Sequence, residues 1–221
     1  MKIVCISQVY WPDTASVAQH LVDLLQALSD HGHDVTVITS RHNYEHPEIM
    51  YPAMEHHNGV RIHRLSNTGF GKKTKLGRLA DFLSFNVLIS CKLRAAKMKN
   101  IRFVYWTMDL QPELSLVAGY MKAGSIPAKS MQKCGDYVFH QSDKIIVLDD
   151  YMKQHINRRL HTEKSGIDVI PVWPVMTAVF EGGRMENPFR IENGFGDRIV
   201  IMYSGNHSVM HPLTTLLDAA V

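Results

Sequence analysis

The chain has 221 residues, of which 45% are hydrophobic and 20% charged, a globular composition that excludes disordered, collagen-like and disulfide-rich chains. The net charge is only +3, and the three cysteines are far apart without a CxxC pair, so neither a disulfide framework nor a zinc knuckle is expected. No apolar run approaches the roughly 20 residues of a membrane span, and the N-terminal run is too short and polar for a signal peptide, so we expect a cytoplasmic protein or one bound only to a membrane surface.

The chain alternates between strand and helix patterns. The first half has a strand at 3–9, a helix from Val17 to the stop signal Gly32, a strand at 34–40 rich in β-branched residues, a strand at 60–63 after the turn signal Asn58-Gly59, and an amphipathic helix at 76–99. The second half has a strand at 102–108, a helix from about Pro127 to Gln141, a strand at 144–148, a helix with Met152, Ile156 and Leu160 at four-residue spacing, and a strand at 168–172. Such alternation predicts parallel crossovers, so residues 1–172 are expected to form a doubly wound, Rossmann-like α/β domain.

A different pattern follows this domain. Residues 173–197 contain two prolines and four glycines with little periodicity, which predicts a linker. Residues 198–203 (RIVIMY) predict a buried strand, residues 204–206 a turn, and the apolar stripe of Leu213, Leu216, Leu217 and Ala220 a helix. One strand and one partial helix cannot bury their own apolar surface, so residues 198–221 are expected to begin a truncated second domain.

A basic segment lies between residues 71 and 102, where nine basic residues accompany the single acid Asp81. Bulky apolar residues such as Phe70 and Phe82 lie among the cations, a mixture typical of a helix on anionic lipid headgroups. The expected membrane patch is Lys72, Lys73, Lys75 and Arg78. A solvated helix face is an open alternative, whereas nucleic acid is disfavoured because no known nucleic-acid motif accompanies the patch.

Ligands of parallel sheets bind at the carboxyl ends of the strands, so the loops that follow the strands hold the candidate site residues. The first loop and the start of its helix contain Trp11, Asp13, Thr14 and Ser16, and the helix N-terminus suits a phosphate or a sugar hydroxyl. Asp13 or Thr14 as a plain helix N-cap is equally open. The loop lacks the glycines of G-x-G-x-x-G, which disfavours a nucleotide-cofactor oxidoreductase.

Two further loops carry polar residues. Asp109, Gln111 and Glu113 follow the fourth strand, and carboxylates there can orient or deprotonate a sugar hydroxyl, although either carboxylate can instead cap a short helix. Arg41, His42, Asn43 and Tyr44 follow the second strand as a third polar cluster, in which Arg41 and Asn43 are the candidate substrate-binding residues. No metal site is expected, because no HExxH motif or Cys/His spacing is present.

Four stretches resemble the retaining family 4 glycosyltransferases, particularly those that build bacterial surface polysaccharides. These stretches are residues 1–12 (MKIVCISQVYWP), 31–39 (HGHDVTVIT), 106–113 (WTMDLQPE) and 201–206 (IMYSGN). The resemblance implies the GT-B arrangement of two Rossmann-like domains, with the acceptor bound mainly by the first and a nucleotide sugar mainly by the second. It implies no metal or other cofactor.

The resemblance also implies roles for particular residues. It places Asp109 near the reacting acceptor hydroxyl, and Gly205 and Asn206 near the donor phosphates. It implies that the segment 70–99 docks on the inner face of the cytoplasmic membrane, where a lipid-linked saccharide acceptor would lie.

Two departures from the family pattern limit these implications. Thr14-Ala15-Ser16 stands where many members have Gly-Gly, and the paired glutamates of the second domain lie beyond Val221. The leading interpretation is therefore a fragment of a hexosyltransferase-type enzyme, inactive alone, with Asp109 and Glu113 as catalytic residues. The alternative is a non-catalytic acceptor-binding or interaction module.

Overall fold

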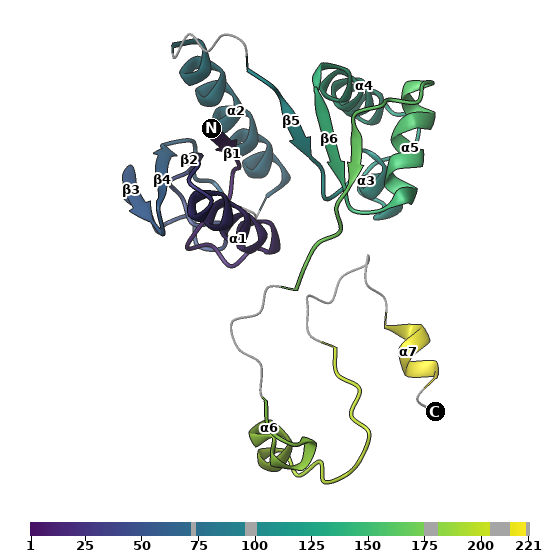
Figure 1. The fold of residues 1–221 in the computed structure, drawn as a ribbon. Coiled ribbons are helices and arrows are strands. Elements are labelled where there is room, and N and C mark those ends of the chain that lie inside the picture. The colour runs from purple at the N-terminus through teal and green to yellow at the C-terminus, as the bar shows by residue number, and fades with distance from the viewer. Residues whose placement is uncertain (72–73, 96–100, 175–180, 204–212, 220–221) are drawn as a thin grey trace. The chain divides into compact units, whose positions relative to one another are not determined.

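The computed structural model describes residues 1–71, 74–95, 101–174, 181–203 and 213–219 (Figure 1). The chain divides into two compact units. Unit 1 consists of Met1–Arg102 and Pro171–Val175, and unit 2 consists of Phe103–Ile170 and Met176–Val221. Each unit has its own sheet, and each is described by itself below.

Unit 1 contains a four-stranded sheet in the order β1-β2-β4-β3. Its strands are β1 (Lys2–Ile6), β2 (Asp34–Ser40), β3 (Met54–His57) and β4 (Val60–Leu65). Strands β1, β2 and β4 are parallel, so their carboxyl ends lie at the same edge of the sheet. Strand β3 pairs antiparallel with β4 through the turn at Asn58 and Gly59, both of which have positive φ.

Two helices cover this sheet. Helix α1 (Ser16–Asp30) packs against β2 and β4 with its buried side chains, which include Leu21 and Leu25. Helix α2 (Lys75–Ala95) packs Phe85 and Ile89 against Ile38 of β2. Since alternate residues of a strand point to opposite faces, the burial of both Val37 and Ile38 shows that both faces of β2 are covered.

The segment 171–174 completes unit 1 from far along the chain. The Trp173 indole Nε1 donates to Asp23 Oδ2 at 3.1 Å, and His20 Nε2 lies 2.9 Å from the Trp173 carbonyl oxygen. Both Asp23 and His20 belong to α1. The chain therefore returns to the first helix after it has built the sheet of unit 2.

Unit 2 contains a parallel sheet in the order β5-β6-β7. Its elements are β5 (Val104–Trp106), α3 (Glu113–Val117), α4 (Ile126–Gln141), β6 (Lys144–Val147), α5 (Asp150–Leu160) and β7 (Ile167–Val169). Ser125 and Asp149 cap α4 and α5 by accepting hydrogen bonds from backbone N–H groups. The core comprises Phe139, Ile145, Val147, Met152, Ile156, Leu160 and Ile167.

The C-terminal part differs from the sequence prediction. Residues 198–203 have no regular structure and are exposed, so the predicted buried strand is wrong. An apolar run forms a strand only where a neighbour pairs with it, and no described strand pairs with this one. The predicted linker contains η1 (Arg184–Glu186) and α6 (Pro188–Glu192), while α7 (Thr214–Asp218) lies where a helix was predicted.

The structure confirms an α/β fold with parallel, Rossmann-like sheets. The domain boundaries at residues 172 and 197 stay predictions. None of the helices in the described ranges is both long and apolar enough to span a bilayer.

Candidate functional site

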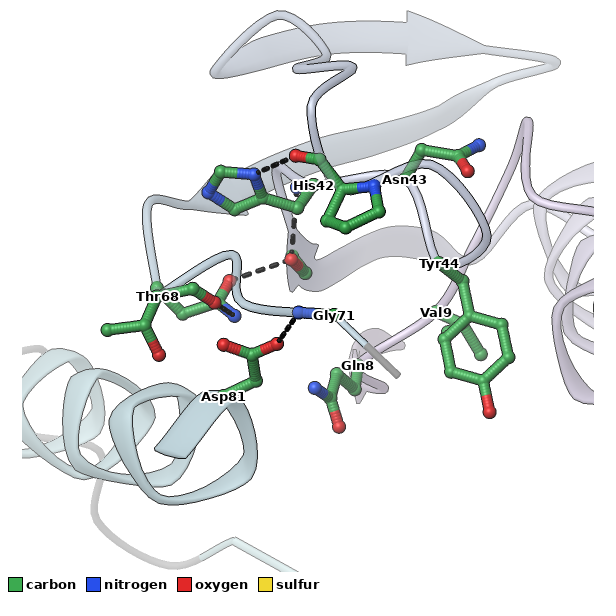
Figure 2. Close-up of a pocket in the computed structure, with 11 residues that line it drawn as sticks. Gln8, Val9, His42, Asn43, Tyr44, Thr68, Gly71 and Asp81 are labelled. Atoms are coloured by element: carbon green, nitrogen blue, oxygen red, sulfur yellow. Dashed lines mark hydrogen bonds between the residues drawn. The ribbon is translucent and has the colours of Figure 1, made fainter. Parts of the chain in front are cut away.

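A cavity of about 180 Å³ lies at the carboxyl ends of β1, β2 and β4 in unit 1 (Figure 2). Each strand contributes through the loop that follows it, and α2 contributes one side chain. The lining residues are Gln8 and Val9 after β1, Ser40, His42, Asn43, Tyr44 and Pro47 at the end of and after β2, Asn67, Thr68 and Gly71 after β4, and Asp81 of α2. The cavity therefore occupies the sheet edge at which parallel strands position ligands.

Two buried polar residues join the end of β2 to the loop after β4. The Ser40 hydroxyl donates to Asn67 Oδ1 at 2.7 Å and accepts from the His42 backbone N–H at 3.1 Å. The Asn67 amide donates in turn to the Thr68 carbonyl oxygen at 2.9 Å. These bonds order the cavity wall before any ligand binds.

The His42 ring is held in one orientation. Its Nδ1 lies 2.7 Å from the Pro47 carbonyl oxygen, and because a carbonyl oxygen only accepts, Nδ1 carries the proton. Gly69 makes room for the ring, since a Cβ at this position would lie 2.5 Å from His42 Nδ1. The loop after β2 is therefore braced against the loop after β4.

Asp81 connects α2 to the loop after β4. Its Oδ1 accepts from the Phe70 N–H at 3.0 Å. Its Oδ2 accepts from the Gly71 N–H at 2.8 Å, the bond drawn in Figure 2. The side chain is buried, with 8% of the residue exposed. The sequence marked Asp81 only as the single acid of a basic segment.

Asp13 is neither a helix cap nor a lining residue. The N-cap of α1 is Ala15, without a side-chain bond, so the alternative in which Asp13 or Thr14 caps the helix is wrong. Asp13 Oδ1 instead accepts from the Tyr44 N–H at 3.0 Å and from the Tyr51 hydroxyl at 3.4 Å. Burial raises the pKa of Asp13, and the Tyr44 and Tyr51 hydrogen bonds partly oppose that rise. Asp13 thus ties the cavity loop that contains Tyr44 to the first loop.

The other predicted residues of the first loop lie outside the cavity lining. Trp11 stacks on His57 with ring centroids 4.0 Å apart, and its carbonyl oxygen accepts from Arg64 at 2.7 Å. Thr14 and Ser16 are exposed. The first loop reaches the cavity instead through Gln8 and Val9, which the sequence did not single out.

Of the two residues predicted after β2, only Asn43 lines the cavity. Its Oδ1 accepts from the Glu45 and His46 N–H groups at 2.9 and 2.6 Å, and its Nδ2 donates to the Tyr51 hydroxyl. Most of its hydrogen-bonding capacity therefore shapes the loop. Arg41 donates to the Tyr51 carbonyl oxygen at 3.0 Å and to the Ser66 hydroxyl at 3.3 Å.

The predicted catalytic residues belong to unit 2. The N-cap of α3 is Pro112, so neither Asp109 nor Glu113 caps this helix. Glu113 accepts from Arg159 at 3.0 Å and from His155 Nε2 at 2.8 Å. Burial raises the pKa of Glu113, but the His155 hydrogen bond and the Arg159 charge outweigh burial and bring the pKa below its usual value.

The neighbouring residues of this loop differ in exposure. Asp109 is exposed, and its backbone carbonyl oxygen accepts from the Thr107 hydroxyl at 2.9 Å. Gln111 Oε1 accepts from the Ser115 hydroxyl at 2.7 Å. Asp109 is therefore the more accessible of the two predicted catalytic carboxylates.

Several predicted residues fall at or beyond the limits of the described ranges. Gly205, Asn206, Lys72 and Lys73 lie outside the described residues, whereas Lys75 begins α2 and Arg78 lies in its first turn. Within the described ranges, no three His, Cys, Asp or Glu side chains gather in a group that could hold a metal ion.

The parallel strands and the ordered cavity at the carboxyl edge of the unit 1 sheet define a Rossmann-like α/β protein. The profile of Glycosyltransferase Family 4 matches residues 17–172, which is more than half of the chain, and the chain belongs to this family.

One solved structure supports the fold. Sucrose-phosphate synthase from Thermosynechococcus elongatus is similar at a TM-score of 0.51 and 15% identity, over 77% of this chain and 47% of that protein. The chain thus spans about half the length of this structural relative. A search of curated protein sequences found no match.

Proposed function

We propose that the cavity of unit 1 holds a sugar ring of the acceptor in a reaction that transfers a sugar from a nucleotide-sugar donor. The observation that supports this proposal is the set of polar side chains in the cavity lining, which are the amides of Gln8, Asn43 and Asn67, the hydroxyls of Ser40, Tyr44 and Thr68, and the carboxylate of Asp81. Such groups match the alternating donors and acceptors of sugar hydroxyls. Membership of a glycosyltransferase family supports glycosyl transfer as the chemistry.

The cavity size favours a single sugar unit. Its volume of about 180 Å³ is smaller than the roughly 300–1,000 Å³ of sites for drug-sized ligands. A lipid-linked saccharide would place its terminal ring in the cavity and leave its lipid outside. This acceptor, in the synthesis of a bacterial surface polysaccharide, is the substrate that we propose.

Asp109 is the proposed catalytic carboxylate. It is exposed at the carboxyl end of β5, whereas Glu113 is engaged by Arg159 and His155. An accessible carboxylate can orient or deprotonate the acceptor hydroxyl. We propose that the anomeric configuration is retained, that Gly205 and Asn206 contact the donor phosphates, and that no metal or other cofactor is needed.

Acceptor binding is tested on the 221-residue chain with methyl hexopyranosides in ligand-observed NMR. Gln8 lines the cavity without being buried, so Gln8→Ala should leave the fold intact and weaken binding several-fold. The matched control is Gln19→Ala, because Gln19 is exposed on α1 and outside the lining. Absence of sugar binding at millimolar concentration, or an equal effect of both variants, would contradict the proposal.

Catalysis is tested in a longer version that includes a donor-binding domain. Asp109→Ala should abolish transfer while circular dichroism stays unchanged, and unchanged turnover would remove Asp109 from the mechanism. The described residues that line the cavity come from unit 1, so an acceptor-binding module without catalysis is the second candidate. Nucleotide release from a sugar nucleotide by the 221-residue chain would exclude that candidate.

We also propose peripheral contact with the inner face of the cytoplasmic membrane through α2. Leu76, Leu83 and Val87 are 80%, 52% and 61% exposed and share one stripe of this helix, while Phe85 and Ile89 are buried on the opposite side. Exposed apolar groups near basic residues are typical of helices that bind anionic lipid.

Vesicle co-sedimentation tests this contact. Changing Lys72, Lys73 and Lys75 together to glutamate should reduce binding to anionic vesicles. The control with the same charge change is glutamate at the exposed residues Lys122, Lys129 and Lys133 of unit 2. If the unmodified chain does not bind vesicles, the patch is a solvated face.

A further inference from the structure

Asp81 is the single carboxylate among the described residues that line the cavity, and this described lining includes neither lysine nor arginine. Its partners are two neutral backbone N–H groups, of Phe70 and Gly71. An ionised carboxylate therefore gives the described part of the cavity wall a negative charge.

The carboxylate retains the capacity to bind a ligand. An ionised carboxylate has about four acceptor positions, and the two backbone bonds, at 3.0 and 2.8 Å, use one on each oxygen. These bonds also hold the side chain in place, so its orientation does not depend on the ligand (Figure 2). The two oxygens of one carboxylate lie close together, so each can accept a hydrogen bond from one of two hydroxyls on adjacent ring carbons.

We propose that Asp81 determines acceptor specificity: it accepts hydrogen bonds from two adjacent hydroxyls of a neutral sugar and excludes sugars that carry a carboxylate or phosphate. The inference rests on the proposed function of the cavity and adds the class of sugar that it takes. It assigns to Asp81 a role in ligand discrimination beyond its bonds to the loop.

The discrimination has an electrostatic cause. Two like charges within a few ångströms repel by about 1 kcal/mol in water and by severalfold more at a partly buried protein site. Asp81 itself is only 8% exposed, so little water surrounds its side chain to screen this repulsion. Specificity against a ligand is commonly produced by such a repulsive group.

The experiment compares two probes that differ in one group, a methyl hexopyranoside and the corresponding methyl uronoside, by ligand-observed NMR on the 221-residue chain. The unmodified chain should bind the neutral sugar about tenfold more tightly than the acidic one. In Asp81→Asn this ratio should approach one, because the negative charge is removed while an acceptor oxygen remains.

Asp23→Asn is the control, since it makes the same change in net charge on α1, where Asp23 accepts from the Trp173 indole outside the cavity. Its binding ratio should equal that of the unmodified chain. The amide signal of Gly71 reports whether the loop bound by Asp81 has moved.

The binding ratio separates specificity from a purely structural role. If Asp81→Asn weakens both probes equally and leaves their ratio unchanged, Asp81 only holds the loop and the inference fails. Equal binding of both probes by the unmodified chain also overturns it. If neither probe binds the unmodified chain, the proposed function itself fails, which is a distinguishable result.

Discussion

Replacing Arg159 by methionine would remove the cation that two acidic side chains of unit 2 share. The guanidinium donates to Glu113 at 3.0 Å, to Asp136 at 2.7 Å and to the Gln111 carbonyl oxygen at 2.9 Å. The Arg159 side chain is only 6% exposed. Its loss would leave two carboxylates and a carbonyl oxygen without their shared donor.

The expected cost follows from how much water can replace the lost partner. Removing one partner of a buried ion pair costs about 3–5 kcal/mol. Glu113 and Asp136 are 29% and 26% exposed, so partial hydration places the cost at the lower end, about 3 kcal/mol. With a urea m-value of about 1–3 kcal/mol/M, the midpoint for unit 2 should fall by at least about 1 M.

Urea unfolding followed by circular dichroism measures this shift, with Arg158→Met as the control. Arg158 is the neighbouring residue of α5 and is exposed, and its guanidinium lies 6.0 Å from the Tyr151 ring centroid. An exposed contact of this kind contributes about 0.5–1 kcal/mol. Equal midpoints for the two variants would refute the assignment of Glu113 and Arg159 to a stabilising network.

Three further predictions concern pH and packing. The pKa of Glu113 lies below its usual 4.5, so the ionised Glu113 stabilises the fold. The difference in stability between the unmodified chain and Glu113→Gln should be largest above about pH 5 and should decline as pH falls through the folded pKa. Urea midpoints measured across this pH range test the prediction. The pKa of Asp13 lies above its usual 3.8, so the contribution of Asp13 to folding stability is present below about pH 4 and is lost as pH rises through the folded pKa. The stability of Asp13→Asn relative to the unmodified chain should therefore increase between about pH 4 and 7, and a decrease would contradict the raised pKa. Gly69→Ala should destabilise unit 1 by about 1–3 kcal/mol, because the new Cβ would lie 2.5 Å from His42 Nδ1 and break the hydrogen bond from His42 to the Pro47 carbonyl oxygen. An unchanged melting temperature would show that the His42 ring moves aside without cost.

Elements with a strong local pattern were predictable from the sequence. The β-branched run predicted β2 with the observed bounds Asp34–Ser40, and the four-residue spacing of Met152, Ile156 and Leu160 predicted α5. Strand β3 has the sequence MEHH, which has no apolar alternation, and it forms because it pairs with β4. The run RIVIMY shows the reverse, since an apolar pattern without a described partner strand stays irregular.

The position of the cavity was predictable, but most of its residues were not. Parallel topology places the loops after β1, β2 and β4 at one edge, which is why Asn43, predicted from the loop after β2, lies in the cavity lining. Asp81 comes from a helix after the third of these loops and reaches the edge only through tertiary packing. Asp13 has the residue type and position of a helix cap, yet its hydrogen bond to Tyr44, 31 residues away, decides its role.

The docking of Trp173 on α1 has a consequence for biosynthesis. The indole and its partner Asp23 are 150 residues apart, and the last segment of unit 1 follows the whole 103–170 stretch of unit 2. At about 5–20 residues per second, a ribosome delivers this segment on the order of ten seconds after Arg102. During synthesis, the nascent first helix therefore keeps its Trp173-binding surface uncovered while a second folding nucleus forms behind it.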